Sequence, residues 1–527
     1  MKKIPTYEEL LAQNSALKKQ VKTLSEKNEK LEIRNKELDA NYNWILEQLK
    51  LSKKKIYGAS AEKIAEEYGQ LNLFNEAELE REPLKPEPEL EEITYKRKKA
   101  NKKTYTEKYG DLPVEEVIYD IPEEEKICSK CGSKMSFMKY ETRRELKIVP
   151  AKVTVVEHKR AVYVCRSCDK NGTEGNIITA DGVPSLMEKS LASPSILAYI
   201  MNQKFCNGLP LFRQEQEFKR MDVRLSRQTM ANWMISGANL LKPVYDKLRE
   251  QLAGQDLIHA DETPVEVLCE EGREPEAKSY MWVYITGRYS ENAAVLYKYE
   301  TGRSGEFANK FLKGFKGYMH CDGWAGYDKV ENAKRCGCWV HLRRYFMNAM
   351  EVQEDKTDYS TLAGKAVLKI REIFAAEKLD PEKPGEKSEY SLDEIAEIRR
   401  SKSALLVREF FEFCEENQGI SLPKSLLGKA FAYALNQKNT LETFLEDPRI
   451  ELSNNAAERA VKPFVIGRKN WLFCYSPAGA QASAIIYSII ETAKANNLNP
   501  QKYLEDVFEG IRSGKSTEAL LPWNLYI

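Results

Sequence analysis

Near the N-terminus, apolar residues return at every seventh position. Leu or Ile fills these positions: Leu10, Leu17, Leu24, Leu31, Leu38 and Ile45. The residues between them are mostly polar, and a seven-residue apolar repeat is typical of a coiled coil. The pattern therefore predicts a coiled-coil dimerisation helix within residues 1–55, which would form a homodimer or a larger assembly through residues 7–49. The alternative is a long helix that packs against its own protein.

A two-residue alternation of polar and apolar positions marks residues 145–164, which are rich in β-branched side chains. This period predicts strands. Two Cys-x-x-Cys pairs flank the segment: Cys128, Cys131, Cys165 and Cys168. A hairpin would bring the pairs together, and four thiolates form a closed, structural Zn²⁺ site. We expect a zinc-binding ribbon over residues 111–180; four unrelated buried cysteines are the alternative.

Between the heptads and this ribbon the apolar periodicity is lost. Residues 74–93 hold eight acidic residues, two basic residues and three prolines. That composition is typical of a solvated linker, which we place at residues 56–110. The basic block at 96–103 is either surface charge on the linker or a contact with phosphate.

Residues 209–234 show a helical pattern that breaks at Met221–Asp222 and then resumes. Ser226 is a suitable N-cap for the second helix. Polar side chains of types that contact base edges would face outward from it: Arg227, Gln228 and Asn232. We expect a helix-turn-helix DNA-binding region within residues 181–250. An ordinary helical hairpin fits the same pattern.

Five apolar runs follow, rich in β-branched and aromatic residues, and they predict strands. They occupy residues 256–267, 279–287, 293–300, 317–327 and 335–339. With helical patterns after the third, fourth and fifth runs, the order is β-β-β-α-β-α-β-α, which is that of a ribonuclease-H-like fold. In this topology the middle of the first strand lies beside the end of the fourth, so that Asp261 meets Asp322.

Two adjacent carboxylates repel each other unless a cation lies between them. Hard oxygen ligands with open positions suit Mg²⁺ or Mn²⁺, and Glu458 from a later helix is the candidate third acid. Two of these acids also have simpler interpretations. Asp261 could cap a strand end and competes with Glu262, and Glu458 could sit at the third position of a helix capped by Asn455.

Glu458 is followed by four cations: Arg459, Lys462, Arg468 and Lys469. On a helix that ends or kinks at Pro463, one face would offer a carboxylate to metal and the next would offer cations to DNA phosphates. The histidines His259 and His320 share strand faces with the two aspartates. They are either partners of the metal ligands or ordinary strand residues, and we favour the second interpretation.

Composition narrows the remaining choices. The chain of 527 residues has 81 basic and 80 acidic residues, so any nucleic-acid surface must be local. The 11 cysteines are typical of a reducing compartment, because four of them form the two metal-binding pairs. No apolar run follows "MKKIPTYEEL", as a signal peptide would require, and "ASAIIYSII" is too short to span a bilayer. We therefore expect a cytoplasmic protein without a membrane span, associated with the nucleoid when on DNA.

These motifs together resemble the transposases of the insertion sequence 66 family, which belong to the DDE group. The resemblance rests on an ordered set: "YGASAEK", "QLNLFNEAE", the Cys-x-x-Cys ribbon, "GLPLFRQEQEF", "LSRQTMANW", "HADETPV", "CDGWAGY", "CWVHLRRYF" and "SNNAAERAVKPFVIGRKNWLF". It departs from the family pattern in that Asp222 stands where a glycine is usual and Trp324 where a tyrosine is more usual.

The resemblance implies metal-dependent cleavage and joining of DNA strands at the ends of an insertion sequence. It places the acidic triad at Asp261, Asp322 and Glu458, in a catalytic core of residues 251–352 and 451–495. A helical insertion at 353–450 and a C-terminal helical tail at 496–527 complete a multidomain α/β chain. Partners implied are terminal repeats, target DNA and accessory proteins from the same element. A non-catalytic DNA-binding regulator, or a nuclease or resolvase without strand transfer, are the alternatives.

Overall fold

The structure is a computed structural model of the whole chain. It describes residues 177–525 except 354, 384 and 385, residues 151–164, parts of 116–140, and most positions between 14 and 25 with scattered ones up to 45. The chain divides into two compact units, residues 59–154 and residues 1–58 together with 155–527.

Every described position between residues 14 and 45 is α-helical, as the heptad repeat predicts. The described apolar heptad side chains are 53% to 65% exposed: Leu17, Val21, Leu24, Leu38, Tyr42 and Ile45. In a single chain these side chains are not packed into a core, which favours pairing with another helix over packing against the chain itself. The dimer stays a prediction.

Most of the strand predicted before Cys165 is not a strand. β1 (Val162–Val164) pairs antiparallel with β2 (Ile177–Thr179), but residues 151–161 are exposed and form no ladder. The alternation was misleading because no core surface covers its apolar positions. The four candidate zinc ligands lie outside the described residues: Cys128, Cys131, Cys165 and Cys168.

The predicted helical pair is present as α6 (Leu211–Arg220) and α7 (Arg227–Ala253), preceded by α5 (Pro194–Phe205). The Ser226 hydroxyl accepts a hydrogen bond from the Thr229 amide at 3.1 Å, as expected of an N-cap. In the turn, Asp222 has a φ of 60°, a left-handed conformation that Asp tolerates better than most residues. The second helix runs well beyond residue 234 and carries core residues along its length.

The five predicted strands form one mixed sheet in the order β5-β4-β3-β6-β7. The strands are β3 (Leu257–Glu266), β4 (Lys278–Thr286), β5 (Val295–Glu300), β6 (Gly317–Cys321) and β7 (Ala333–Gly337). β4 runs antiparallel to β3 and β5, whereas β6 runs parallel to β3 and β7. The helix expected between β6 and β7 is only the 3₁₀ turn η3 (Ala325–Lys329); α8 (Gly305–Phe311) and α9 (Trp339–Glu351) are present as predicted.

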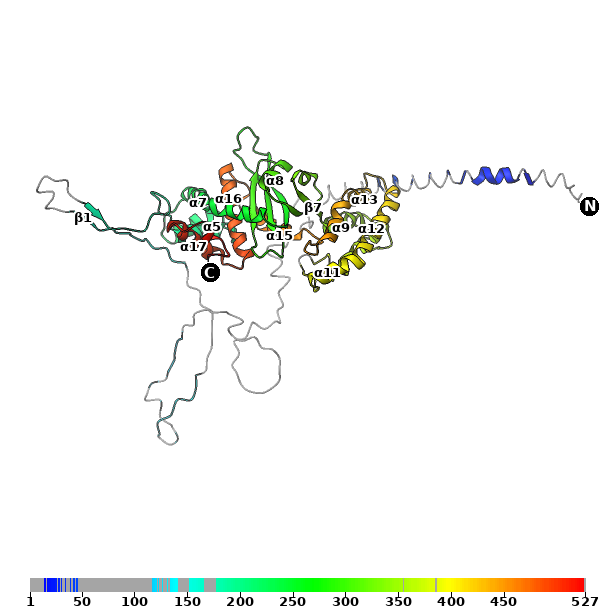
Figure 1. The fold of residues 1–527 in the computed structure, drawn as a ribbon. Coiled ribbons are helices and arrows are strands. Elements are labelled where there is room, and N and C mark those ends of the chain that lie inside the picture. The colour runs from blue at the N-terminus through cyan, green and yellow to red at the C-terminus, as the bar shows by residue number, and fades with distance from the viewer. Residues whose placement is uncertain are drawn as a thin grey trace, which may run out of the picture. The chain divides into compact units, whose positions relative to one another are not determined.

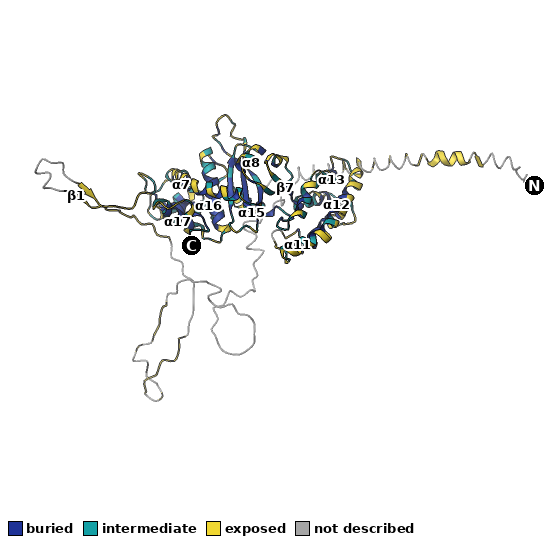
Figure 2. Ribbon diagram, in the orientation of Figure 1, coloured by how far each residue is buried: buried dark blue, intermediate teal, exposed yellow. Residues whose placement is uncertain are grey.

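Helices cover the sheet and bury its apolar side chains (Figures 1 and 2). α15 (Asn455–Trp471) packs on β3 and β4, α16 (Pro477–Ala495) packs on β5 and α7, and α17 (Pro500–Arg512) packs on α5. Hydroxyls of α16 complete the outer edge of the sheet, because Ser488 and Thr492 accept hydrogen bonds from amides of β5 at 2.8 and 3.0 Å. An edge protected in this way cannot pair with another strand.

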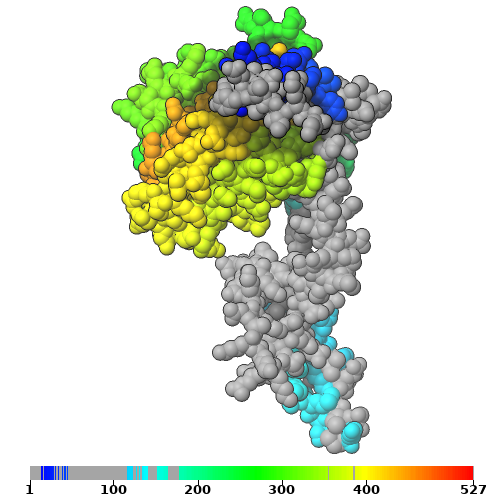
Figure 3. Space-filling view, turned by 90° about the vertical axis from the view of Figure 1, so that its right-hand side faces the viewer, coloured from blue at the N-terminus to red at the C-terminus, as the bar shows by residue number. Residues whose placement is uncertain are grey.

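The predicted helices of residues 353–450 are present and pack with α9 around a core of their own, which includes Trp339, Phe346 and Phe410. They are α10 (Leu362–Ala376), α11 (Leu392–Ile398), α12 (Ala404–Asn417), α13 (Leu426–Asn436) and α14 (Lys438–Glu442). In the space-filling view these helices, in yellow and yellow-green, form one continuous surface (Figure 3). No described helix has the length and apolar character needed to cross a membrane.

Candidate active site

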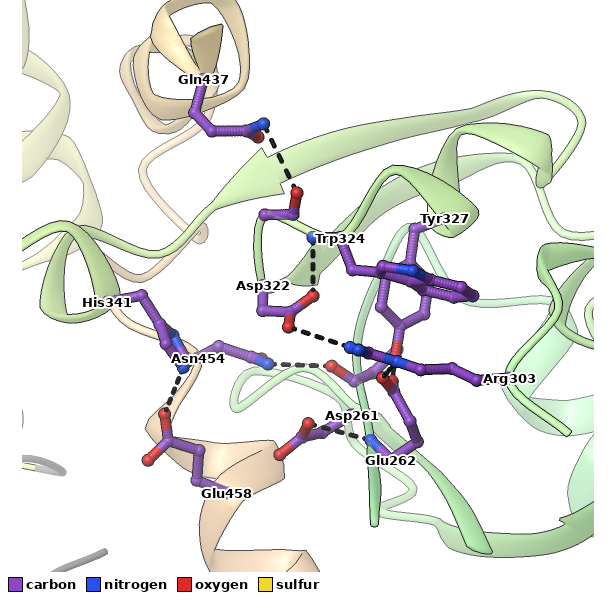
Figure 4. Close-up of polar contacts among 12 residues, drawn as sticks. Asp261, Glu262, Arg303, Asp322, Trp324, Tyr327, His341, Gln437, Asn454 and Glu458 are labelled. Carbon is purple, nitrogen blue, oxygen red and sulfur yellow. Dashed lines mark hydrogen bonds and ion pairs between the residues drawn. The ribbon is translucent and has the colours of Figure 1, made fainter. Parts of the chain in front are cut away.

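The sheet brings two predicted acids together. β3 and β6 pair in parallel with His259 opposite His320, and Asp261 and Asp322 each follow two residues later. Figure 4 shows their carboxylates facing a common space, with Glu458 of α15 on its other side. Three segments far apart in the sequence therefore supply the three acids predicted to form the site.

Asp261 and Glu262 alternate across the strand, and their surroundings separate the two candidates. Glu262 is 3% exposed in its side chain and accepts hydrogen bonds from the Arg303 guanidinium and the Tyr327 hydroxyl. Asp261 accepts one hydrogen bond, from the Glu262 amide at 2.9 Å. Glu262 is thus neutralised inside the protein, whereas Asp261 keeps spare acceptor capacity.

The surroundings of Asp261 favour its protonated form. Burial and the charges of Glu262, Asp322 and Glu458 together raise the pKa of Asp261 to about 8, against a single lowering contribution from the Glu262 amide. A cation at the site would reverse this balance, because opposite charge favours the ionised form.

Asp322 is the first residue after β6 and is held from two sides. Its Oδ1 accepts a hydrogen bond from the Trp324 amide at 3.0 Å, and its Oδ2 lies 3.4 Å from Arg303 Nη2. The Arg303 guanidinium also stacks over the Trp324 ring at 4.6 Å. Trp324 packs against Trp282, with ring centroids 5.8 Å apart, and so retains an aromatic packing role at this position.

Glu458 does not cap its helix. The N-cap of α15 is Asn454 rather than Asn455, and the Asn454 side chain instead donates to the Ala260 carbonyl at 2.8 Å. The Glu458 carboxylate faces His341 Nε2 at 3.5 Å and Arg344 Nη2 at 3.8 Å. Its Oε1 is buried, and no described group donates a hydrogen bond to it.

The two strand histidines make no hydrogen bond or ion pair with Asp261, Asp322 or Glu458 in the described structure. His259 Nδ1 lies 3.1 Å from Asn454 Oδ1 and its Nε2 lies 3.3 Å from Glu451, which also pairs with Arg288 at 2.9 Å. Although burial opposes it, His259 and Arg288 lower the pKa of Glu451 to about 2. Burial lowers the pKa of His320 to about 3, which keeps the ring neutral.

The cations of α15 divide into two groups. Arg459, Lys462 and Lys469 are exposed, whereas Arg468 is half-buried and donates a hydrogen bond to the Pro264 carbonyl of β3. The prediction that Pro463 ends or kinks the helix early is wrong in its extent, because α15 continues to Trp471.

Two tyrosine hydroxyls contact backbone carbonyls of α15 near Pro463, whose ring lacks a backbone donor. The Tyr297 hydroxyl of β5 donates a hydrogen bond to the neighbouring Ala460 carbonyl. The Tyr487 hydroxyl lies 3.4 Å from the Pro463 carbonyl.

Sequence reasoning missed the groups that hold the acids. His341 and Arg344 lie three positions apart in "CWVHLRRYF", a helical spacing that places them on one face, and this signal was available. Arg303 had no local signal. The insertion also reaches the site, because a Cβ on Gly323 would lie 2.5 Å from the Tyr433 ring. Glycine at this position allows the insertion to pack beside Asp322.

The donor set suits a hard divalent cation, since carboxylate oxygens are the ligands that Mg²⁺ and Mn²⁺ prefer. Glu458 Oε1 lies 3.5 Å from His341 Nε2 but accepts no hydrogen bond from the described residues, so it could also serve as such a ligand. Within the described residues no three acidic, histidine or cysteine side chains converge closely enough to hold a metal ion, so the carboxylates would have to draw together to share one. Arg303, His341 and Arg344 are the cationic groups that pair with them in the structure.

Comparisons with known proteins identify the family to which the chain belongs. A family model for the Transposase IS66 family matches residues 189–482. Shorter matches are to the zinc-finger binding domain of transposase IS66 at 125–169, the IS66 C-terminal element at 488–523, and Transposase C of IS166 homeodomain at 44–117. These matches follow one another along most of the sequence.

Two relatives from Sinorhizobium fredii (strain NBRC 101917 / NGR234), Uncharacterized protein y4qI and Uncharacterized protein y4jD, are 31% and 29% identical. The alignments cover 78% and 79% of this chain and 75% and 81% of the relatives. A solved structure, the Drosophila P element transposase strand transfer complex, aligns at 9% identity over 57% of this chain and 92% of that chain, with a TM-score of 0.34 that supports no conclusion. The extent of the family match shows that the chain belongs to the IS66 family of transposases.

Proposed function

We propose that this transposase cleaves DNA at the ends of its insertion sequence and joins the ends to target DNA by metal-dependent phosphoryl transfer. Asp261, Asp322 and Glu458 would form the acidic triad. The observation that carries the proposal is the common space faced by these three carboxylates, where Glu458 meets only His341 and Arg344, at 3.5 and 3.8 Å. The sheet order β5-β4-β3-β6-β7 supports a ribonuclease-H-like core.

The triad would hold Mg²⁺ or Mn²⁺, which supplies activation of the attacking water or 3′-hydroxyl and charge neutralisation at the leaving oxygen. The protein's own residues provide position. His341 and Arg344 hold the Glu458 carboxylate from α9, and the Trp324 amide fixes Asp322 Oδ1. Asn454 ties the start of α15 to the Ala260 carbonyl, next to Asp261.

Double-stranded DNA would bind on two helices. Arg227, Gln228 and Asn232 are exposed in the first turns of α7, after the left-handed turn at Asp222, which supports a helix-turn-helix that reads the terminal repeat. On α15 the exposed cations would bind phosphates near the acids: Arg459, Lys462 and Lys469. Arg468 would act indirectly by fixing α15 to β3.

The remaining parts follow from the sequence. The coiled coil of 1–55 would pair chains through residues 7–49, the linker would cover 56–110, and the ribbon of 111–180 would hold Zn²⁺ through its four cysteines. The helix-turn-helix would occupy residues 181–250, and the catalytic core would occupy 251–352 and 451–495. The helical insertion would cover 353–450 and the C-terminal tail 496–527. Accessory proteins from the same element would complete the machinery in the cytoplasm.

A cleavage assay tests this proposal against its alternatives. Full-length protein is mixed with Mg²⁺ and duplexes taken from the element's ends, with each strand labelled separately and a target plasmid present. We expect strand breaks at the element boundary and labelled ends joined to the plasmid. Binding without any break would indicate a regulator, and breaks without joining would indicate a nuclease or resolvase.

A further inference from the structure

An exposed apolar wedge follows the C-terminal end of α15. It consists of Leu472, Phe473 and Tyr475, which are 65%, 42% and 70% exposed. Large apolar side chains gathered on a surface commonly mark a binding site. Neither the acidic site nor the packing of the sheet uses these three side chains.

The backbone beneath the wedge is fixed. Buried Cys474 lies between Phe473 and Tyr475, and its amide donates to the Glu266 carbonyl at 2.9 Å. The amides of Leu268 and Cys269 donate to the carbonyls of Cys474 and Tyr475 at 3.1 and 3.0 Å, which continues the line of β3.

The turn into the wedge is strained. Leu472 has φ 65° and ψ −56°, and the Phe473 amide donates to the Trp471 carbonyl at 2.8 Å. These are the marks of a γ-turn with a left-handed central residue, a rare and costly conformation for leucine. The strain places Leu472 outside the protein at the point where α15 ends.

A row of cations connects the wedge with the acidic site. Arg459, Lys462 and Lys469 are exposed at spacings of three and seven residues, so they share one face of α15. Among the described residues, none of the three is paired with an acidic side chain. This row begins next to Glu458 and ends three residues before Leu472. Its charge is complementary to a phosphate backbone.

We propose that the wedge of Leu472, Phe473 and Tyr475 inserts against the bases of the element-end DNA while the cations of α15 follow its backbone. This rests on the proposed function, because the DNA is placed by the acidic site. Leu472 follows Glu458 by 14 residues, about 21 Å along the helix at 1.5 Å per residue. That length corresponds to roughly six base pairs at 3.4 Å each. The wedge would therefore unstack a base step about six pairs from the cleaved phosphate.

The test uses full-length protein and element-end duplexes that carry 2-aminopurine at one position at a time. We expect a fluorescence increase that peaks about six base pairs from the cleavage site. Phe473→Ala combined with Tyr475→Ala should abolish the peak and weaken binding about 5- to 100-fold. Phe473→Trp should keep the peak. Tyr359→Ala, which removes an exposed tyrosine of the insertion, should change neither quantity.

Two results would overturn the wedge. One is an unchanged fluorescence profile in the folded double variant; the other is unchanged DNA binding with a lower assembly mass, which would make the patch a protein contact. Asp261→Asn separates the two proposals, because it should abolish cleavage and keep the fluorescence peak. Cleavage by Asp261→Asn would refute the triad and leave the profile as a separate observation about DNA binding.

Discussion

Glu377 of the helical insertion and Glu458 of α15 show how differently this chain surrounds its carboxylates. Glu377 is 3% exposed and meets the Arg399 guanidinium at 2.7 and 3.0 Å, and that guanidinium also donates to backbone carbonyls, including those of Asp447 and Ile450. Glu458 has only longer contacts, from Oε1 to His341 Nε2 at 3.5 Å and from Oε2 to Arg344 Nη2 at 3.8 Å. The first arrangement is complete, and the second is open.

This difference separates stability from function. A buried ion pair with all donors satisfied is costly to break, because its partner is left as an unpaired charge. Carboxylates that repel one another gain nothing for the fold, and a bound cation would relieve that repulsion. Loss of the Glu377 pair should therefore destabilise the fold, whereas loss of the open acids should stop the reaction.

The largest effect is expected at the open site. Asp261→Asn, Asp322→Asn and Glu458→Gln should each reduce strand cleavage by on the order of 1000-fold or more, because each removes a charged ligand. In thermal unfolding, these three variants should be no less stable than the original chain. Glu451→Gln is the matched control, since it alters a paired glutamate near the start of α15. An equal loss of cleavage in Glu451→Gln would remove the distinction between this paired glutamate and the three acids of the open site.

Next in size is the closed pair. Arg399→Met should lower the free energy of unfolding by about 3–5 kcal/mol, because Glu377 is left buried without its partner. Urea titration measures the change. The adjacent, exposed Arg400 pairs with Glu397 at 2.8 Å, and Arg400→Ala should cost less than about 1 kcal/mol. Similar losses of unfolding free energy for Arg399→Met and Arg400→Ala would show that burial does not determine how much an ion pair contributes to stability.

A smaller, pH-dependent effect is expected at Glu451. Its pKa is lowered to about 2 in the fold from a normal value of 4.5, so its ionisation stabilises the folded state above pH 4.5. Glu451→Gln should lose about 2–3 kcal/mol at neutral pH. The difference between the two proteins should shrink as pH falls from 4.5 towards 2. Urea titrations across this range check the sign, and a gap that widens in acid would contradict it.

The smallest effect concerns the cation row of α15. Lys462→Ala should weaken binding to element-end DNA and reduce the slope of log affinity against log salt by about 1, because one phosphate contact is lost. Arg468→Ala should leave the slope unchanged and lower stability, since its guanidinium bonds to β3. Fluorescence anisotropy at several salt concentrations distinguishes them. Equal slopes for Lys462→Ala and the original chain would exclude a phosphate contact there.

Sequence reasoning worked where local pattern decides structure. The five strands, the Ser226 cap and the helices of 353–450 all follow from periodicity and capping chemistry. The approach of Asp261 to Asp322 then followed from strand order, since parallel neighbours fix which residues lie side by side. The place of Glu458 beside them came from family resemblance, because nothing local indicates which later helix returns to the sheet.

It failed where distant residues decide. Local pattern predicted a helix that ends or kinks at Pro463, but α15 continues past it to Trp471. Alternation predicted strands over 145–164, but strands need a partner and a surface to cover, and residues 151–161 have neither in the described structure. Arg303 holds Glu262 and Asp322 across the sheet, a relation that only the assembled fold reveals.

The central claim is that Asp261, Asp322 and Glu458 share one divalent cation site. Mn²⁺ titration of the full-length protein, followed by electron paramagnetic resonance, tests it without requiring catalysis. We predict saturable Mn²⁺ binding that is weakened by Asp261→Asn, Asp322→Asn and Glu458→Gln alike and retained in Glu451→Gln. Binding that is unchanged in all three variants, or no saturable binding in the original chain, would contradict the shared site.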